Sequence, residues 1–433
     1  MKTVAAALAL VLAAPALAQT AGTTPATYIH AGRLLDRPGQ APRGASTVVV
    51  RDGKVAEVRD GYAQPEAGAT VIDLKDRFVL PGLIDMHVHL LGIGGDPLRE
   101  RLLAINTEPG DRLLYGAGNA RKTLHAGFTT VRDLGGEPRG IRALRDAIDR
   151  GDVEGPTIVN AGAPISVTGG HGDPLNGLAE PYAHAVAAEV NNTCDGPEDC
   201  RRAVRRQVGL GAQVIKFMAT GGVLSNVSGG LGRAMEPDEM KAVIDTAHSL
   251  GRKVAAHSHA AEGSLAAVNA GVDTIDHGSF LDDPTIRAMK AKGAWLVPTM
   301  LAPRAALAQA RAGLLPPATI PKAEAAGAAA MASHKRAIAA GVKVAFGTDT
   351  GVSKHGDNAQ EFALMVEAGM TPAQAIRAAT VSAAEALGRD DLGALTPGKA
   401  ADLIAVSGSP LDDVRVLEKV EFVMRRGVVA KRP

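Results

Sequence analysis

The sequence has little of several features that would place it in a protein class. Its 433 residues hold 47 Lys and Arg against 46 Asp and Glu, so no excess of positive charge points to a nucleic-acid partner. Aromatic residues make up 3%, and two cysteines are too few for a disulfide-rich scaffold or for two zinc-binding pairs. No uninterrupted apolar run approaches the roughly 20 residues of a membrane anchor. With 46% hydrophobic and 21% charged residues, disorder is also excluded.

The first 18 residues have the pattern of a signal peptide. Lys2 precedes an apolar run from Val4 to Ala14, and Ala16-Leu17-Ala18 provides the small residues of a cleavage site. Cleavage near Ala18 would send the mature chain to the periplasm or out of the cell. In that oxidising compartment Cys194 and Cys200 are candidates for a local disulfide, and two free thiols are the alternative.

Short strand-like runs separated by turns occupy both ends of the chain. Residues 45–50 and 55–58 flank Asp52-Gly53, a hairpin signal, and residues 401–406 and 420–424 follow the same pattern. We therefore expect residues 19–80 and 393–433 to form one small β-sandwich domain.

Residues 81–392 alternate strand-like runs with Ala-rich helical runs, which predicts an α/β fold with a parallel sheet and helices outside it. Eight strands over this length favour a (β/α)8 TIM barrel, and an open doubly wound sheet is the alternative. The predicted strands are Val79–His89, Thr129–Leu134, Thr157–Ala161, Val214–Ala219, Lys253–His259, Thr274–Gly278, Trp295–Pro298 and Lys343–Thr348.

Polar residues recur where these strands end. His87 and His89 are two apart on one strand, so their side chains point to the same side, as two ligands of one metal ion must. His257, His277 and Asp349 follow later strands. Because active sites of barrels form at the carboxyl ends of their strands, these five residues predict a metal site, most simply for zinc. Ordinary hydrogen-bonded residues at strand ends are the alternative.

Lys216 lies among apolar residues in the fourth predicted strand. A buried lysine is costly unless it is paired or neutral. A neutral amine can take up carbon dioxide as a carbamate, whose two oxygens can bridge two cations. A salt bridge to Asp349, or a side chain that points outward, is the alternative.

The order of these motifs resembles that of the metal-dependent amidohydrolase superfamily, over essentially the whole mature chain. The motifs that carry the resemblance are PGLIDMHVH (81–89), VIK (214–216), AHSH (256–259), DHG (276–278), GTD (347–349) and GKAADL (398–403). TGGHGD (168–173) and ATGGV (219–223) are similar to its imidazolonepropionase-like, Xaa-Pro dipeptidase-like branch.

The resemblance implies two divalent metal ions, most simply Zn, with Mn, Co or Fe as alternatives. By position, His87, His89 and Asp349 would bind the first ion and His257 and His277 the second. Carbamylated Lys216 would bridge the two ions. Imidazolonepropionases proper lack this lysine, which argues against that activity.

The resemblance also implies the reaction. Its branch contains carboxypeptidase-like hydrolases of dipeptides and N-acyl amino acids, and enzymes that split ochratoxin A into ochratoxin alpha and phenylalanine. We expect Asp349 to move the proton, and His171 or His259 to contact the substrate near the developing oxyanion. Arg233, in the Gly-rich segment 221–235, is a candidate for the substrate carboxylate; an incidental exposed arginine is the alternative.

Other activities stay open at this point. A prolidase-type dipeptidase, a lactonase and a deaminase all fit the same scaffold, and an exported binding protein without activity would be expected to have lost its ligands. The partner is expected to be a small amide or dipeptide, with no nucleic acid and no membrane. Relatives in the branch imply a homo-oligomer, including octamers.

Overall fold

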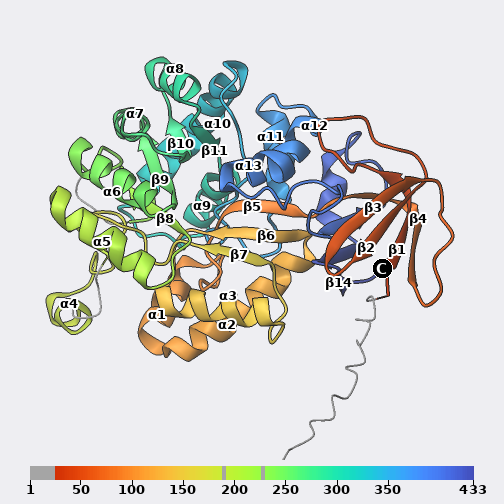
Figure 1. The fold of residues 1–433 in the computed structure, drawn as a ribbon. Coiled ribbons are helices and arrows are strands. Elements are labelled where there is room, and N and C mark those ends of the chain that lie inside the picture. The colour runs from red at the N-terminus through yellow and green to blue at the C-terminus, as the bar shows by residue number, and fades with distance from the viewer. Residues whose placement is uncertain (1–24, 188–191, 226–229) are drawn as a thin grey trace, which may run out of the picture.

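The structure is a computed structural model that describes residues 25–187, 192–225 and 230–433 (Figure 1). The predicted signal peptide lies outside the described residues. Two parts are seen in the fold. A β-rich part is built from both ends of the chain, and a larger part alternates strands and helices (Figure 1).

Both ends of the chain contribute to one seven-stranded sheet, in the order β14-β13-β12-β4-β1-β2-β3. The antiparallel pairing of β4 with β12 joins the two ends, and Ile404 lies opposite Leu80 there. Its strands are β1 (Thr27–Leu34), β2 (Ser46–Arg51), β3 (Lys54–Asp60), β4 (Thr70–Pro81), β12 (Leu403–Val406), β13 (Phe422–Arg425) and β14 (Val428–Lys431).

The terminal sheet differs from the expected sandwich, because its strands form one hydrogen-bonded sheet. A bridge between Lys54 and Ala400 brings the β3 edge back to the chain just before β12, so the sheet curls around its own apolar core. The predicted β2–β3 hairpin is confirmed. Its turn needs positive φ at Asp52 and Gly53, 50° and 73°, which Asp and Gly tolerate best.

The larger part is TIM-barrel-like. One parallel sheet contains β5 (Leu83–Val88), β6 (Phe128–Asp133) and β7 (Thr157–Asn160). A second contains β8 (Val214–Met218), β9 (Lys253–Ala260), β10 (Thr274–Phe280) and β11 (Trp295–Val297). A single bridge between Ile165 and Phe217 links the two sheets beyond β7.

The eighth predicted strand, Lys343–Thr348, is extended chain rather than a regular strand. It bridges β11 at Leu296–Val344, and the Phe346 carbonyl accepts the Met86 amide of β5 at 2.9 Å. The Phe346 amide, however, donates to the Ala378 carbonyl at 3.0 Å, in the π-helical turn η1 (Ala378–Ser382). That bond takes the chain out of a continuous ladder, which sequence pattern alone does not reveal.

The predicted strand Val79–His89 is divided at Gly82, where the chain leaves the terminal sheet and enters the barrel. The Gly82 amide donates to the Asp402 carbonyl at 2.8 Å. A Cβ at this position would lie 2.2 Å from Thr129 Oγ1, so only glycine allows this close approach.

Helices surround the barrel strands, and β6 and β7 lie against α2 and α3 (Figure 1). Within the described part of the chain, no helix is long and apolar enough to cross a membrane. The helices are α1 (Pro97–Asn106), α2 (Pro109–His125), α3 (Pro138–Arg150), α4 (Glu180–Ala187), α5 (Pro197–Gly209), α6 (Pro237–Ser249), α7 (Ala261–Ala270), α8 (Asp283–Lys292), α9 (Leu301–Arg311), α10 (Ile320–Ala339), α11 (Gln360–Glu367), α12 (Pro372–Arg377), α13 (Ala383–Leu387) and the 3-10 helix η2 (Val414–Lys419).

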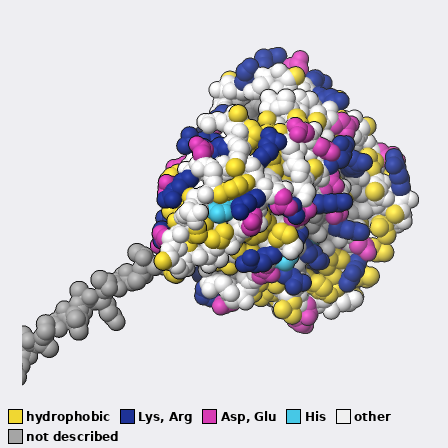
Figure 2. Space-filling model, turned by 90° about the vertical axis from the view of Figure 1, so that its right-hand side faces the viewer, with side chains coloured by type: hydrophobic (Ala, Val, Ile, Leu, Met, Phe, Trp, Pro, Cys, Tyr) yellow, Lys and Arg dark blue, Asp and Glu magenta, His cyan; other side chains and the backbone are white. Residues whose placement is uncertain are grey.

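Two predictions from the sequence concern regions outside the barrel interior. Cys194 and Cys200 are joined by a disulfide, which connects the segment before α5 to its first turn. Basic and acidic side chains are interspersed on the face shown in Figure 2, as expected from the balanced composition.

Candidate active site

The candidate metal ligands meet in one cavity at the carboxyl ends of the barrel strands. The cavity has a volume of about 610 Å³. Its polar lining brings together residues that are up to 262 positions apart, from β5 to the segment after the eighth predicted strand. These are His87, His89, His171, Lys216, His257, His259, His277 and Asp349.

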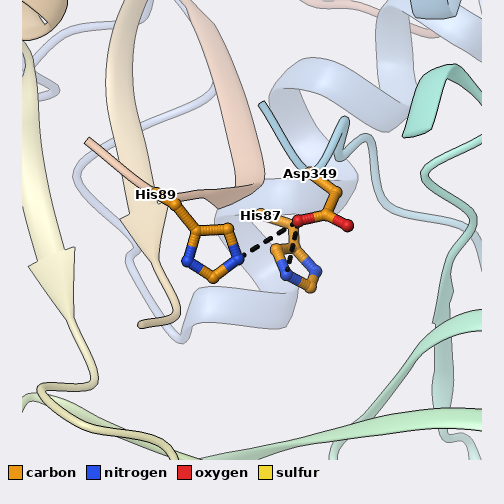
Figure 3. Close-up of side chains that lie close together, drawn as sticks. All are labelled: His87, His89 and Asp349. Carbon is orange, nitrogen blue, oxygen red and sulfur yellow. Dashed lines mark ion pairs between the residues drawn. The ribbon is translucent and has the colours of Figure 1, made fainter. Parts of the chain in front are cut away.

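His87, His89 and Asp349 form the tightest group in the cavity (Figure 3). Asp349 Oδ1 lies 3.4 Å from Nε2 of His87 and 3.1 Å from Nε2 of His89. One ligand atom from each residue lies within 4.8 Å of the others. Two imidazoles and a carboxylate at this spacing are a donor set suited to a divalent ion such as zinc.

The local backbone explains why these three side chains meet. The Asp349 amide donates to the His87 carbonyl at 2.8 Å, and Asp349 has a left-handed φ of 58°. Below them, buried Asp85 accepts the His87 amide at 3.0 Å and the Thr348 hydroxyl at 2.7 Å. Burial raises the pKa of Asp85 to about 6, while its hydrogen bonds, including one from Asn358, act to lower it.

The orientation of the His87 ring is set from the barrel interior. Its Nδ1 lies 2.8 Å from Asp276 Oδ2, and Arg132 pairs with the same carboxylate at 3.1 Å. All three side chains are buried. Burial opposes ionisation of Asp276, but Arg132 and Lys216 lower its pKa well below the ordinary range. A carboxylate on Nδ1 leaves Nε2 free to bind a metal ion.

His257 and His277 form the second group, with ring centroids 4.6 Å apart. The Nδ1 atom of His277 lies 2.8 Å from Thr299 Oγ1, so its Nε2 is the free nitrogen. For His257, Nε2 lies 3.3 Å from the Gly221 carbonyl oxygen. Burial lowers the pKa of both imidazoles well below 6.5, which keeps them neutral and able to act as ligands.

Lys216 lines the same cavity as the two groups and is almost completely buried. Its Nζ lies 3.7 Å from Asp276 Oδ2 and makes no hydrogen bond to any described residue. Asp276, and not Asp349 as the alternative from sequence supposed, is its nearest carboxylate partner. Burial lowers the pKa of this amine to about 8, which raises its neutral fraction.

His171 and His259 also line the cavity. The His171 ring centroid lies 4.4 Å from that of His257. The His259 ring stacks on His277 at 5.0 Å, and its Nδ1 lies 2.9 Å from Ser279 Oγ. The geometry therefore places both histidines beside the second group, at the wall of the cavity.

Arg233 is placed differently from the other predicted site residues. Its guanidinium pairs with Glu236 at 3.0 Å on the surface, and Arg233 is not among the described residues that line the cavity. Arg112 of α2 does line it and pairs with Glu100 at 2.5 Å. Sequence reasoning missed Arg112 because a helical arginine with an acidic partner is usually a solvated surface pair.

One side of the cavity is apolar, which the sequence analysis also missed. Most of the residues that α9 and α10 contribute to this wall are alanines. In the sequence they cannot be distinguished from alanines that pack one helix against another. The wall is formed by Val223, Leu224, Pro298, Ala302, Pro303, Ala306, Ala323, Ala326 and Val352.

A TIM-barrel-like fold with a histidine and carboxylate cluster at the carboxyl ends of its strands defines a class of barrel enzymes. Comparison with protein families agrees, because residues 78–431 match the amidohydrolase family. The chain belongs to the amidohydrolase family, which confirms the resemblance seen in its motifs and the prediction of a hydrolase.

Individual relatives are similar over nearly their whole length. Ochratoxinase from Aspergillus niger is 33% identical over 431 residues, covering 94% of this chain and 87% of the relative. A crystal structure of a Xaa-Pro dipeptidase with bound methionine is 37% identical, with a TM-score of 0.87, covering 93% of this chain and 99% of that one. A prolidase complexed with N-methylphosphonate-L-proline is 30% identical, with a TM-score of 0.85, covering 94% and 100%.

Proposed function

We propose that the protein is a binuclear metal-dependent hydrolase that cleaves the amide bond of N-acyl amino acids or dipeptides with a free carboxylate. The observation that carries the proposal is the position of Lys216. Its buried amine lacks a hydrogen bond among the described residues and lines the same cavity as both groups of metal-ligand candidates. A lysine there is hard to explain as a structural residue, because a buried amine without a hydrogen bond costs stability even with the Asp276 carboxylate 3.7 Å away.

The residues present fit two divalent ions. His87, His89 and Asp349 would hold one ion, and His257 and His277 the other, with the carbamate of Lys216 between them. Carbamate formation joins carbon dioxide to the neutral amine and releases one proton. Zinc is the ion we propose, because neutral imidazoles and carboxylate oxygens are its usual ligands. When bound, the two ions would lower the pKa of a water molecule and polarise the scissile carbonyl.

The chain's own residues would supply the remaining steps. Asp349 would take the proton of the attacking water through its carboxylate and return it to the leaving amine. Burial acts to raise the pKa of Asp349, but His87 and His89 lower it, so the carboxylate is the form that accepts a proton. His171 and His259 lie beside the second group and would donate to the developing oxyanion.

The cavity supports a substrate with one apolar and one charged end. The wall of α9 and α10 would receive the acyl group or apolar side chain. We transfer the carboxylate-binding role expected of Arg233 to Arg112, because Arg112 lines the cavity. Ochratoxin A fits this description, being an aromatic acyl group joined to phenylalanine through an amide. The similarity to ochratoxinase supports it as a substrate.

Cleavage of Xaa-Pro dipeptides is the second candidate. It is supported by the similarity to the dipeptidase and prolidase structures, which cover almost all of the described chain. Both candidates require the same site and differ in the leaving group. We also propose, from the signal-peptide pattern and the disulfide, that the protein acts after export, and from the resemblance that it forms a homo-oligomer.

A substrate panel on zinc-loaded enzyme tests the proposal. We expect turnover of N-acyl amino acids, ochratoxin A or Xaa-Pro dipeptides, and at least tenfold less of the matched amides that lack a free carboxylate. Asp349→Asn is the inactive control, since its side chain keeps the shape and loses the proton acceptor. Turnover confined to lactones or amidines, or none in the whole panel, would contradict the proposal.

A further inference from the structure

Glu361 is a buried acid that the proposed chemistry does not use. It lies near the start of α11, with no exposed surface, and it has no cation among its hydrogen-bond partners in the described residues. Its Oε1 accepts the amide of Met300 at 2.8 Å, and its Oε2 accepts the amide of Leu301 at 2.7 Å. A carboxylate in such surroundings is expensive, so a specific reason for it is expected.

Those two amides begin α9. The first amides of a helix have no partners within the helix, so the two oxygens of Glu361 accept from donors that the helix itself leaves unsatisfied. Met300 itself has no side-chain oxygen to cap the helix. Glu361 therefore caps α9 from about 60 residues away in the sequence, and it fixes the backbone just before the helix at the same time.

The residue before this cap is Thr299, whose backbone is strained. Its φ of 48° lies in the left-handed region, which a β-branched side chain rarely adopts. Thr299 is completely buried and lines the cavity. Strain of this kind persists only where neighbouring contacts hold it, and the two hydrogen bonds from Glu361 hold the next two residues.

The strained turn has a direct consequence at the candidate metal site. It places Thr299 Oγ1 2.8 Å from Nδ1 of His277, which is the contact that leaves Nε2 free. His277 is strained as well, with a φ of 76°. Its carbonyl oxygen lies 2.5 Å from Nε2 of His334 in α10. The ring of His277 is thus held by Thr299, just before α9, and its backbone by His334 of α10.

We propose that Glu361 is a positioning residue for the second metal ion, acting on His277 through the capped start of α9 and Thr299. This inference rests on the proposed function, because it concerns an ion that His257 and His277 would bind. The inference also predicts different effects on the two ions, because the contacts that orient His87 and His89 do not involve Thr299. Loss of this support should weaken one ion selectively.

The test is a zinc titration of chelator-stripped protein in competition with a coloured zinc chelator, which measures both affinities without any substrate. In Glu361→Gln, the side-chain NH2 group faces one of the two backbone amides and cannot accept its hydrogen bond. In Thr299→Val, the hydroxyl is lost while the β-branched shape is kept. We expect each variant to weaken one zinc ion about 10- to 100-fold and to leave the other within about twofold.

Two further variants sharpen the test. Thr299→Ser should restore wild-type affinity, because it restores the hydroxyl. The double variant Glu361→Gln/Thr299→Val should bind the affected zinc ion as tightly as the weaker-binding of the two single variants, because both changes act on the same contact. Asp282→Asn is the matched control, since Asp282 caps α8 through the Thr285 amide at 2.9 Å and is not among the described residues that line the cavity.

The outcomes separate the inference from the proposed function. Wild-type protein that takes up fewer than two zinc ions would contradict the proposed function. Wild-type protein with two ions, and variants with lower thermal stability but both affinities unchanged, would show that Glu361 is only a helix cap. Equal weakening of both ions would also overturn the inference.

Discussion

At the scale of single residues, the sequence predicted the candidate ligands but not the contacts that support them. The ligand candidates were predictable because each follows a strand, and the carboxyl ends of parallel strands meet in space. His87, His89 and Asp349 do come together, as expected. The supporting contacts were not predictable. Nothing local in the sequence links Asp276 to Arg132, or Met300 to Glu361, because such pairs form only when distant segments pack.

The conformation of His171 gives a prediction at this scale. Gly222 lies flat against the His171 ring, and a Cβ there would be 2.3 Å from two of its ring atoms. Gly222→Ala must therefore displace the imidazole or the backbone, an overpacking cost on the order of 1–3 kcal/mol. We expect kcat/KM for an amide substrate to fall tenfold or more.

The control for this prediction is Gly209→Ala in α5. A Cβ at that position meets nothing within 4 Å, so activity should be unchanged. Wild-type kinetics in Gly222→Ala would show that His171 does not contribute from its present position.

At the scale of elements, the strand predictions were right where a buried run was continuous. They were wrong for Lys343–Thr348, where a backbone bond to η1 interrupts the ladder, and for Val79–His89, which passes from one sheet to another at Gly82. Periodicity reports burial, and it does not report which neighbour receives each backbone hydrogen bond.

The disulfide gives a prediction for an element. Cys194 and Asn192 pair with the backbone of Ser166, in the segment that leads to His171. A bond that closes so short a loop contributes roughly 2 kcal/mol by the chain-entropy account. We expect Cys194→Ser/Cys200→Ser to lower the free energy of unfolding in urea by about this amount and to raise KM more than it lowers kcat.

Wild-type protein unfolded under reducing conditions should reproduce the loss measured for the double variant. If the variant unfolds at the same urea concentration as oxidised wild type, the disulfide does not brace this segment.

For the whole molecule, the composition excluded classes but named no activity. The fold class could largely be predicted from the sequence. The family match confirms a TIM-barrel-like part together with a β-rich part. The curled single sheet could not be predicted from the sequence. Whether its edge strands close on one another depends on long-range pairing, such as that of Lys54 with Ala400. The apolar wall was not predicted, because its alanines resemble those of the other α-helices in the described residues.

Many buried neutral histidines make the folded state sensitive to acid. Burial lowers the pKa of His355 to about 4, below its ordinary 6.5, and it also lowers the pKa of His87, His171 and His259 in the cavity, whereas Asp349 outweighs burial and raises that of His89. The unfolded chain therefore binds more protons below pH 6.5, and stability falls as the pH falls towards 4. Burial raises the pKa of Asp85 and Asp133 to about 6, that of Glu361 to about 8 and that of Asp402 in the same direction; these acids oppose the trend but are fewer than the buried histidines.

His355→Gln isolates one such proton. Between pH 6 and 4.5, the free energy of unfolding of chelator-treated variant should fall less steeply than that of wild type, by about 1.4 kcal/mol for each pH unit. His184→Gln is the control, because His184 is exposed on α4. Parallel pH profiles for His355→Gln and wild type would contradict the account of acid sensitivity.

The binuclear site is tested most directly by a metal titration followed by amide hydrolysis, with wild type and Lys216→Ala side by side. We expect stripped wild-type protein to be inactive, to take up two zinc ions per chain in the presence of bicarbonate, and to reach full activity only with the second. Lys216→Ala, folded by circular dichroism, should bind fewer than two ions and lose at least 100-fold in kcat/KM. Full hydrolysis without metal, or two ions and full activity in Lys216→Ala, would contradict the proposed binuclear site.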